Sequence, residues 1–311
     1  MSQEYCSILT QKLHVDGAGT APPNTKYFLF VETEQPWEKN EKAMEEYPKF
    51  AFGLADGTIK IHLLAPDSFS KTGYKKILFF KIDPMNVGNF TRKEYSVPVA
   101  DTEELIKSLF TEDQSIFSQY QITDSNIRDI FICGHMAKDY CCGTFGNGLY
   151  QATKQFLHDH QDDYLNVRVW QTSHLKGHKF APTVIDFPEG RFWAHVSEEL
   201  LFKKILPIDK QDSLDDLKIH IRGLAGTNNF GQIAERELFL LYGSNWQHFK
   251  KTIEIVEDPE DSKLATVNIS FEGPNGTEIK QIKVKFLSEF TSVADHACGE
   301  ISNFRKAEVQ M

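Results

Sequence analysis

The sequence lacks both a long apolar run and an excess of basic charge. None of its 311 residues belong to a stretch of about 18 apolar residues, and the mean hydropathy is -0.39, so we expect no membrane-spanning helix. The N-terminal segment has no basic stretch followed by an apolar one, which argues against a secretory signal. Lys and Arg number 34 against 44 Asp and Glu, whereas nucleic-acid-binding domains usually carry a basic excess. We therefore expect a cytoplasmic protein that binds neither membrane nor nucleic acid.

Cysteine is scarce as well. Five cysteines, at positions 6, 133, 141, 142 and 298, are too few and odd in number for a disulfide scaffold. In a reducing compartment, clustered cysteines indicate metal or redox chemistry instead. No C-x-x-C motif occurs, which argues against a thioredoxin-type dithiol. The clustered cysteines in the middle of the chain are therefore the first place to look for a functional site.

The middle of the chain, residues 126–210, has the element order of a thioredoxin-like domain. We predict a strand, a Gly-rich loop with the cysteines, a helix, a second strand, another loop, a hairpin and a helix. The predicted strands are Asp129–Cys133, Asn166–Trp170, Thr183–Phe187 and Arg191–Val196, and the last helix is Ser197–Ile205. This order corresponds to one βαβ unit and one hairpin in a single sheet. We expect this region to be the one that binds a cofactor.

The flanking regions complete an α/β (α+β) prediction. Residues 1–125 repeat a similar order, with helices expected at Glu38–Tyr47 and Thr102–Phe110, so we interpret them as a degenerate thioredoxin-like half. In that half the segment ETEQPWEKN stands where the cysteine loop would be. Residues 211–311 predict a helix at Asn228–Leu241 followed by a β-meander whose turn lies at Gly273–Gly276.

Two loops hold the residues that predict chemistry. Cys133 ends one predicted strand with Cys141 and Cys142 in the loop behind it, while His174 and His178 follow the next strand. Adjacent parallel strands of a βαβ unit have their carboxyl ends at the same edge, so we expect these loops to meet. Two thiolates and two imidazoles suit either zinc or an iron–sulfur cluster. Because Cys141 and Cys142 are neighbours, we expect only one of them to be a ligand.

Three other interpretations of these cysteines and histidines are a structural zinc site, a Rieske centre and a nucleophilic cysteine. Structural zinc sites usually place cysteines two to four residues apart, whereas eight residues separate Cys133 from Cys142. Cys133-Gly134-His135 looks like the first arm of a Rieske centre, but the second arm is missing, since Phe145 is the third residue after Cys142. His135 is then a loop residue or a donor that supports the ligands. A nucleophilic Cys142 with a lowered pKa before a helix is the third alternative.

The segments CGHMAKDYCCGTFG and WQTSHLKGHKFAPTVIDFPEGRFW resemble the sucrase/ferredoxin-like family. Its members are described as thioredoxin-like [2Fe-2S] proteins with a bis-histidine iron. The resemblance implies that the ligands are Cys133, Cys142, His174 and His178. It extends to the N-terminal segment around Cys6-Ser7, to Arg222-Gly223 and to Cys298-Gly299. Lys176 departs from the glycine that often stands in the H-x-G-G-H motif of the family.

The leading hypothesis is an electron-transfer protein that carries one [2Fe-2S] cluster and serves an unknown redox partner protein. It makes the chain an electron carrier rather than an enzyme, with no catalytic residue. The alternatives are a zinc-stabilised interaction module with the same four ligands and a thiol-dependent redox enzyme with Cys142 as nucleophile. Lys176 and Lys179, beside the histidines, are candidates for docking an acidic partner.

Overall fold

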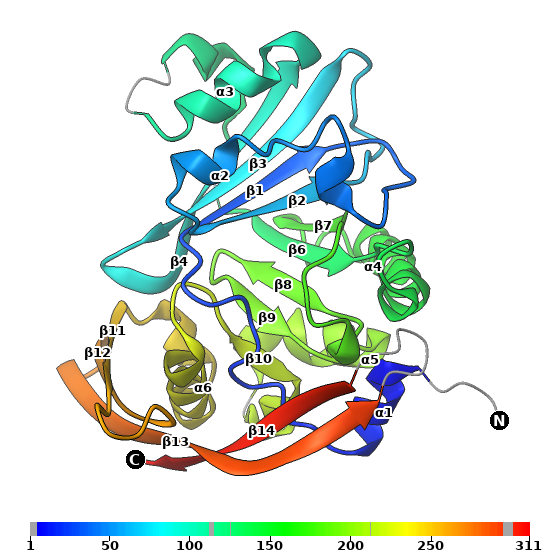
Figure 1. The fold of residues 1–311 in the computed structure, drawn as a ribbon. Helices are drawn as coiled ribbons and strands as arrows, with labels where there is room; N and C mark the ends of the chain where they lie inside the picture. Colours follow the sequence, from blue (N-terminus) through cyan, green and yellow to red (C-terminus); the bar gives the residue numbers. More distant parts are fainter. Residues whose placement is uncertain (1–4, 112–114, 125, 212, 295–300) are drawn as a thin grey trace.

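A sheet of ten strands forms the centre of the computed structural model, which describes residues 5–111, 115–124, 126–211, 213–294 and 301–311 (Figure 1). The strands of this sheet are β1 (Tyr27–Glu32), β2 (Ile59–Leu64), β3 (Tyr74–Asp83), β4 (Asn86–Pro98), β5 (Gln121–Ile122), β6 (Arg128–Cys133), β7 (Val167–Thr172), β8 (Val184–Phe187), β9 (Arg191–Trp193) and β10 (Ile221–Leu224). A four-stranded antiparallel sheet holds β11 (Lys251–Glu257), β12 (Leu264–Gly273), β13 (Gly276–Ala294) and β14 (Ile301–Gln310). The α-helices are α1 (Cys6–Lys12), α2 (Ala51–Leu54), α3 (Thr102–Ser108), α4 (Asn147–Asp159), α5 (Glu198–Leu200) and α6 (Asn229–Tyr242). The expected mixed α/β class is confirmed.

The large sheet consists of two sets of strands with the same order. One set runs β2-β1-β3-β4 and the other β7-β6-β8-β9, and in each the first pair is parallel and the next two are antiparallel. The sets join through one antiparallel residue pair, between Leu64 at the end of β2 and Thr172 at the end of β7. The carboxyl ends of both parallel pairs therefore converge in the middle of the sheet.

Aromatic stacking links equivalent positions of the two sets. Phe30 of β1 corresponds to Phe131 of β6, and Phe80 of β3 corresponds to Phe187 of β8. In the first set Phe28, two residues before Phe30, pairs with Phe80. In the second set Asp129, two residues before Phe131, pairs with Phe187 in the same way. The rings of Phe30 and Phe131 stack with centroids 3.8 Å apart, and those of Phe80 and Phe187 with centroids 3.9 Å apart. Stacked aromatic pairs add to the stability that buried area provides. A continuous aromatic core thus holds the two sets together.

Alternation along β6 decides which face Cys133 occupies. Successive side chains of a strand point to opposite faces, so Ile130 and Ile132 pack in the core under α4. Phe131 and Cys133 lie on the other face, in the aromatic core. The position equivalent to Cys133 in the first set is Glu32, since Phe30 corresponds to Phe131. The first set therefore carries a carboxylate where the second carries a thiol.

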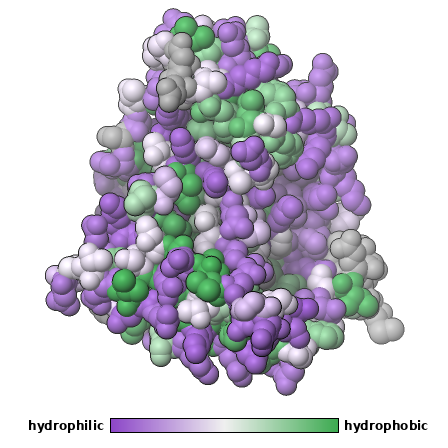
Figure 2. Space-filling model, turned by 60° about the vertical axis from the view of Figure 1, so that its left-hand side comes forward, coloured by the Kyte–Doolittle hydropathy of each residue, from purple (hydrophilic) through white to green (hydrophobic). Residues whose placement is uncertain are grey.

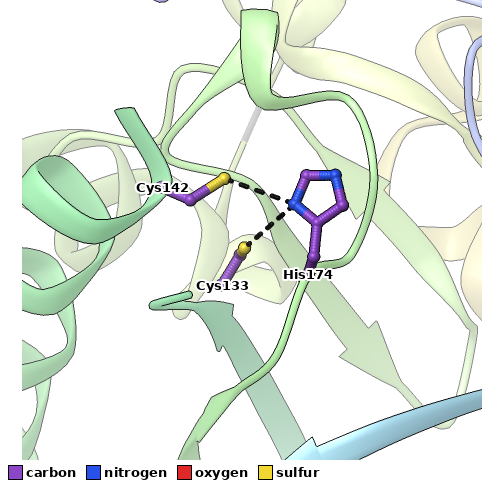
Figure 3. Close-up of side chains that lie close together, drawn as sticks. All are labelled: Cys133, Cys142 and His174. Carbon is purple, nitrogen blue, oxygen red and sulfur yellow. Dashed lines mark hydrogen bonds between the residues drawn. The ribbon is translucent and has the colours of Figure 1, made fainter. Parts of the chain in front are cut away.

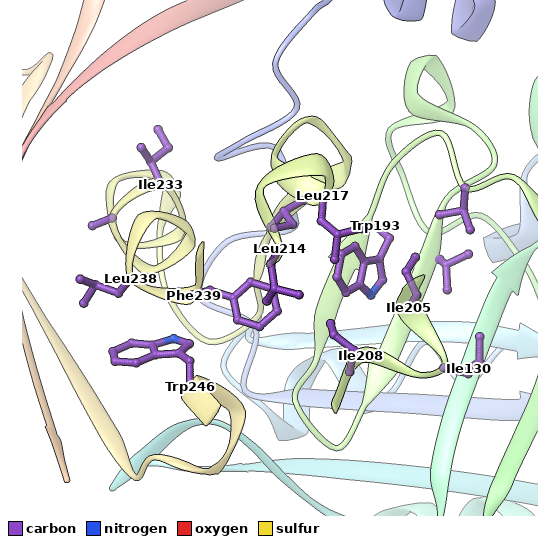
Figure 4. Close-up of a cluster of buried hydrophobic side chains, with 14 of the residues drawn as sticks. Ile130, Trp193, Ile205, Ile208, Leu214, Leu217, Ile233, Leu238, Phe239 and Trp246 are labelled. Atoms are coloured by element: carbon purple, nitrogen blue, oxygen red, sulfur yellow. The ribbon is translucent and has the colours of Figure 1, made fainter. Parts of the chain in front are cut away.

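The C-terminal sheet and α6 pack against the second set of strands. Asn228 caps α6 by accepting a hydrogen bond of 3.2 Å from the N–H of Gly231, as a side-chain N-cap does. Trp193 and Phe239 belong to the core between α6 and the large sheet (Figure 4). Trp246 belongs to the same core and packs against Phe271 of β12. β10 extends the large sheet beyond β9, although it follows the segment 126–210 in sequence. The predicted helix before the meander and the turn within Gly273–Gly276 are confirmed.

One predicted element is wrong. The segment Glu38–Tyr47 forms only a 3-10 turn, Glu41–Ala43, and not a helix. Its chain is instead held by tertiary contacts, because the Tyr47 side chain is buried and its hydroxyl donates a hydrogen bond of 3.3 Å to the carbonyl of Ile61. Such contacts override local helix propensity.

On the face shown in Figure 2, hydrophilic residues predominate, and hydrophobic ones gather in small groups between them. In the described part of the chain, every helix is too short or too polar to cross a membrane.

Candidate metal centre

The two loops that carry cysteine and histidine follow the carboxyl ends of two adjacent parallel strands, β6 and β7. Cys133 is the last residue of β6 and pairs with Thr172, the last residue of the parallel strand β7. His174 follows two residues later. Cys142 begins a π-helical turn, Cys142–Gly146, that leads into α4. The meeting of the loops that the βαβ order predicts is confirmed.

Three donor atoms come together at this edge (Figure 3). The Nδ1 atom of His174 lies 3.9 Å from Cys133 Sγ and 3.7 Å from Cys142 Sγ. All three lie within 4.8 Å of one another. Both cysteines are fully buried, whereas His174 is partly exposed. Two sulfurs and one imidazole nitrogen in this arrangement make a candidate site for a metal that prefers soft ligands.

His178 and Cys141 lie beside this group. The ring centroids of His174 and His178 are 6.0 Å apart, and His178 Nε2 lies 3.9 Å from a carboxylate oxygen of Asp139. The Cys141 sulfur contacts Cys6 instead of Cys133. Of the two adjacent cysteines, Cys142 is therefore the one that lies with Cys133. Cys298 is outside the described residues.

The pKa values of the two buried thiols are shifted in opposite directions. Burial alone would raise the pKa of the Cys133 thiol, but hydrogen bonds from Cys142 and His174 outweigh it and place this pKa well below its ordinary value. The hydrogen bond to Cys133, together with burial, raises the pKa of Cys142 well above its ordinary value. One thiolate is thus stabilised at the site, and thiolate is the form that binds metals.

The cysteine loop needs a glycine where it touches the end of β6. A Cβ atom on Gly146 would lie 1.8 Å from the carbonyl oxygen of Cys133, which is inside van der Waals contact. Gly148, two residues further along, has open space at the same position. Gly146 therefore allows the π-helical turn to approach Cys133 closely.

A buried arginine that the sequence pattern did not assign to the site supports the histidine loop. Arg222, on β10, donates hydrogen bonds to the carbonyls of Lys176 (3.0 Å) and Thr20 (2.6 Å). Burial lowers the pKa of Arg222 to about 10, and negative charge on Cys142 or Cys133 opposes this shift. Its guanidinium is therefore charged at neutral pH and partly balances the negative charge of the Cys133 thiolate. Arg222 lies far along the chain in no metal-ligand motif, so only the resemblance pointed to it.

The first half of the chain covers the cysteine loop. His135 is buried and donates a hydrogen bond of 2.9 Å from Nε2 to the carbonyl of Glu38. Burial raises the pKa of Glu41, although a hydrogen bond from Ser173 opposes the shift. The segment ETEQPWEKN and the residue after it, Glu41, thus pack over the site. His135 acts as an anchor for this cover, in agreement with its expected place outside the ligand set.

Of the two lysines near the histidines, only Lys176 is exposed. Lys179 is 3% exposed, and its ammonium donates a hydrogen bond of 2.5 Å to the hydroxyl of Ser302 on β14. The expectation that Lys179 docks a partner is wrong, because its charge is used inside the protein.

Comparison with known proteins identifies the family of the chain. Residues 18–211, more than half of the chain, match the sucrase/ferredoxin-like family model. The chain belongs to the sucrase/ferredoxin-like family. The matched range includes Cys133, Cys142, His174 and His178. "Altered inheritance of mitochondria protein 32" of Meyerozyma guilliermondii is 29% identical over 114 residues, which are 36% of this chain and 37% of that protein. The similarity therefore spans little more than a third of that relative. No solved structure matches the chain.

The donor set of this family member fits more than one group. Zinc binds cysteine sulfur and histidine nitrogen in tetrahedral sites, and [2Fe-2S] clusters accept two cysteines and two histidines. Oxygen-preferring ions such as Mg²⁺ and Ca²⁺ do not suit two buried thiols. The geometry supports a candidate Cys/His metal site.

Proposed function

We propose that the protein transfers electrons through one [2Fe-2S] cluster. Cys133 and Cys142 hold one iron, and His174 and His178 hold the other. The observation that carries the proposal is the convergence of two buried thiols with His174 at one edge of the sheet, in a chain of the sucrase/ferredoxin-like family. The cluster supplies a one-electron redox couple when it is bound.

The residues around the site have different roles in the proposed electron transfer. The thiols are buried, so water is excluded from the side of the cluster that they hold. His174 and His178 are partly exposed, and this side gives a partner protein access for electron exchange. The Arg222 guanidinium favours the reduced cluster, because a nearby positive charge stabilises added negative charge.

The decisive experiment is a visible spectrum with iron, acid-labile sulfide and zinc analysis on protein purified without oxygen. Two irons and two sulfides per chain with visible absorbance support the cluster. One zinc and a colourless protein would instead support the second candidate, a zinc-stabilised module with the same ligands. A thiol enzyme with Cys142 as nucleophile has less support, since the Cys142 thiol is buried and its pKa is raised.

We also propose a domain organisation and a compartment. Residues 126–210 are a thioredoxin-like cluster-binding domain, residues 1–125 are its degenerate copy, and residues 211–311 form a C-terminal helix and β-meander segment. The matching strand order and the equivalent positions of Phe30 and Phe131 support the duplication. The proposed location is the cytoplasm. Fractionation of cells that express the tagged full chain tests it, because recovery in an organelle fraction would contradict it.

A further inference from the structure

A second pair of sulfurs lies next to the metal centre. The Sγ atoms of Cys6 and Cys141 are 3.2 Å apart, although the two residues are 135 positions apart in the sequence. Cys6 is the first residue of α1, and Cys141 immediately precedes the π-helical turn. Their exposed fractions are 1% and 2%. The tertiary structure therefore buries two distant thiols against each other.

The separation of the sulfurs favours a dithiol over a metal site. A disulfide bond is about 2.05 Å long, so closure requires an approach of only about 1.2 Å. Two sulfurs on one tetrahedral zinc ion, with bonds of about 2.3 Å, lie about 3.8 Å apart and would have to separate. Asp139 is the third group near this pair, and its carboxylate already accepts hydrogen bonds from the N–H groups of Cys141 (2.8 Å) and Cys142 (3.4 Å).

The pair is separate from the ligands of the proposed cluster. Asp139 holds the main chain of Cys141 and Cys142 through those two hydrogen bonds. With the main chain held in this way, Cys141 contacts Cys6, whereas Cys142 lies with Cys133 and His174. Oxidation of Cys6 and Cys141 therefore consumes no proposed ligand.

A cavity lies beside residues that flank the pair. It has a volume of about 580 Å³ and lies between α1, the π-helical turn and the start of α5. Ser7, which follows Cys6, and Thr144 and Phe145 of the turn form part of its wall. A molecule as small as hydrogen peroxide fits this space easily.

We propose that Cys6 and Cys141 are a second redox centre, a dithiol that hydrogen peroxide oxidises to a disulfide between α1 and the cysteine loop. In the first step one thiol attacks the peroxide: an S–O bond forms, the O–O bond breaks, and one water leaves. The other thiol then attacks the sulfenic sulfur: the S–S bond forms, the S–O bond breaks, and a second water leaves. The two thiols lose two electrons and two protons, which the peroxide gains. A dithiol reductant reverses the reaction by thiol–disulfide exchange.

Peptide mapping of the full chain tests the proposal. A Cys298→Ser protein is treated with one equivalent of hydrogen peroxide without oxygen, its remaining thiols are alkylated, and the tryptic digest is analysed by mass spectrometry. We expect residues 1–12 to be linked to residues 139–154, and the link to disappear with dithiothreitol. Because the second peptide also contains Cys142, the link should persist in Cys142→Ser and be absent in Cys141→Ser.

Two further measurements keep the test independent of the cluster. The link should form in a Cys133→Ser/Cys142→Ser double variant, so a failure of the proposed cluster leaves the result readable. In Cys6→Ala, the sulfenic acid of Cys141 should be trapped by dimedone, whereas the Cys298→Ser protein should give the disulfide instead. Absence of the link at a tenfold excess of peroxide would overturn the proposal. So would a zinc ion that is bound in Cys298→Ser and lost in Cys6→Ala.

Discussion

Arg222 donates a hydrogen bond of 3.0 Å to the carbonyl of Lys176, midway between His174 and His178. The same guanidinium also holds the carbonyl of Thr20, so it ties the histidine loop to the N-terminal segment. Gly177 has a φ of 75° and no Cβ, and a Cβ there would lie 2.5 Å from an Arg222 nitrogen. The conformation of the loop that holds both histidines thus depends on the buried Arg222 guanidinium.

Replacement of Arg222 should affect both stability and redox potential. We expect Arg222→Gln to lower the free energy of unfolding by about 3 kcal/mol, since buried carbonyls lose charged donors. It should also lower the midpoint potential, because a positive charge near the thiolates is lost. Arg222→Lys keeps the charge without the planar fork, so it should lose stability but retain more of the potential. Denaturant titration and redox titration measure the two effects. Equal potentials in both variants and the wild type would contradict the electrostatic role.

Two glycines that follow the cysteine loop, Gly146 in the π-helical turn and Gly148 in α4, make a matched pair. We expect Gly146→Ala to displace the π-helical turn and to reduce metal content severely, because its Cβ would meet the Cys133 carbonyl at 1.8 Å. Gly148→Ala lies in α4 with open space around it and should be neutral or stabilising by up to about 1 kcal/mol. Metal analysis and thermal unfolding of both variants check this. Similar metal loss in both would show that the close approach is not the cause.

Replacement of Cys133 or Cys142 should affect the iron content of the protein far more than replacement of Cys141. We expect Cys133→Ser and Cys142→Ser to lose most of the iron, because thiolates are strong ligands for iron. Cys141→Ser, whose side chain contacts Cys6, should keep its iron and its visible spectrum. The measurement is iron per chain after purification without oxygen. Colour retained in Cys142→Ser but lost in Cys141→Ser would reverse the assignment.

Histidine ligation should raise the potential above that of four-cysteine clusters. Neutral imidazoles leave less negative charge on the cluster, as in Rieske centres at about -150 to +300 mV against roughly -400 mV for plant-type clusters. We expect the wild-type potential to fall as the pH rises, because reduction makes the imidazole ligands more basic and couples electron uptake to proton uptake. His178→Cys should keep a cluster, lower its midpoint potential and weaken this fall. Protein-film voltammetry over a range of pH values measures both. An unchanged potential in His178→Cys would argue against His178 as a ligand.

A buried histidine in the aromatic core should make stability depend on pH. Burial lowers the pKa of His62 from 6.5 to about 3, with a smaller contribution from the charge of His174. Between these values the unfolded state binds more protons, so the free energy of unfolding falls by about 1.4 kcal/mol for each unit that the pH decreases. His62→Phe, which can stack between Phe28 and Phe30, should remove this contribution.

The control for His62 is His158→Phe, at the exposed end of α4, which should leave the slope unchanged. Denaturant titrations from pH 4 to pH 7 give the slope for each variant. A wild-type slope in His62→Phe would show that another group carries the acid sensitivity.

Local sequence patterns determined much of the secondary structure and the site. The strand ending at Cys133, the strand before His174, the hairpin of β8 and β9 and the helix α6 follow from periodicity and turn residues, which act over a few neighbouring residues. The βαβ order alone predicted that the cysteine and histidine loops meet, because parallel strands end at one edge. The choice of Cys142 rested on the resemblance to a family.

Only the tertiary structure decided the remaining features. The pairing of Leu64 with Thr172, the stack of Phe30 on Phe131 and the contact of Cys6 with Cys141 each join residues about 100 or more positions apart. No periodicity encodes such contacts, since they depend on how complete elements pack. The same holds for the segment Glu38–Tyr47, where packing over the cysteine loop replaced the expected helix. A buried charge such as Arg222 acquires its role only when burial removes water and brings its partners within hydrogen-bond distance.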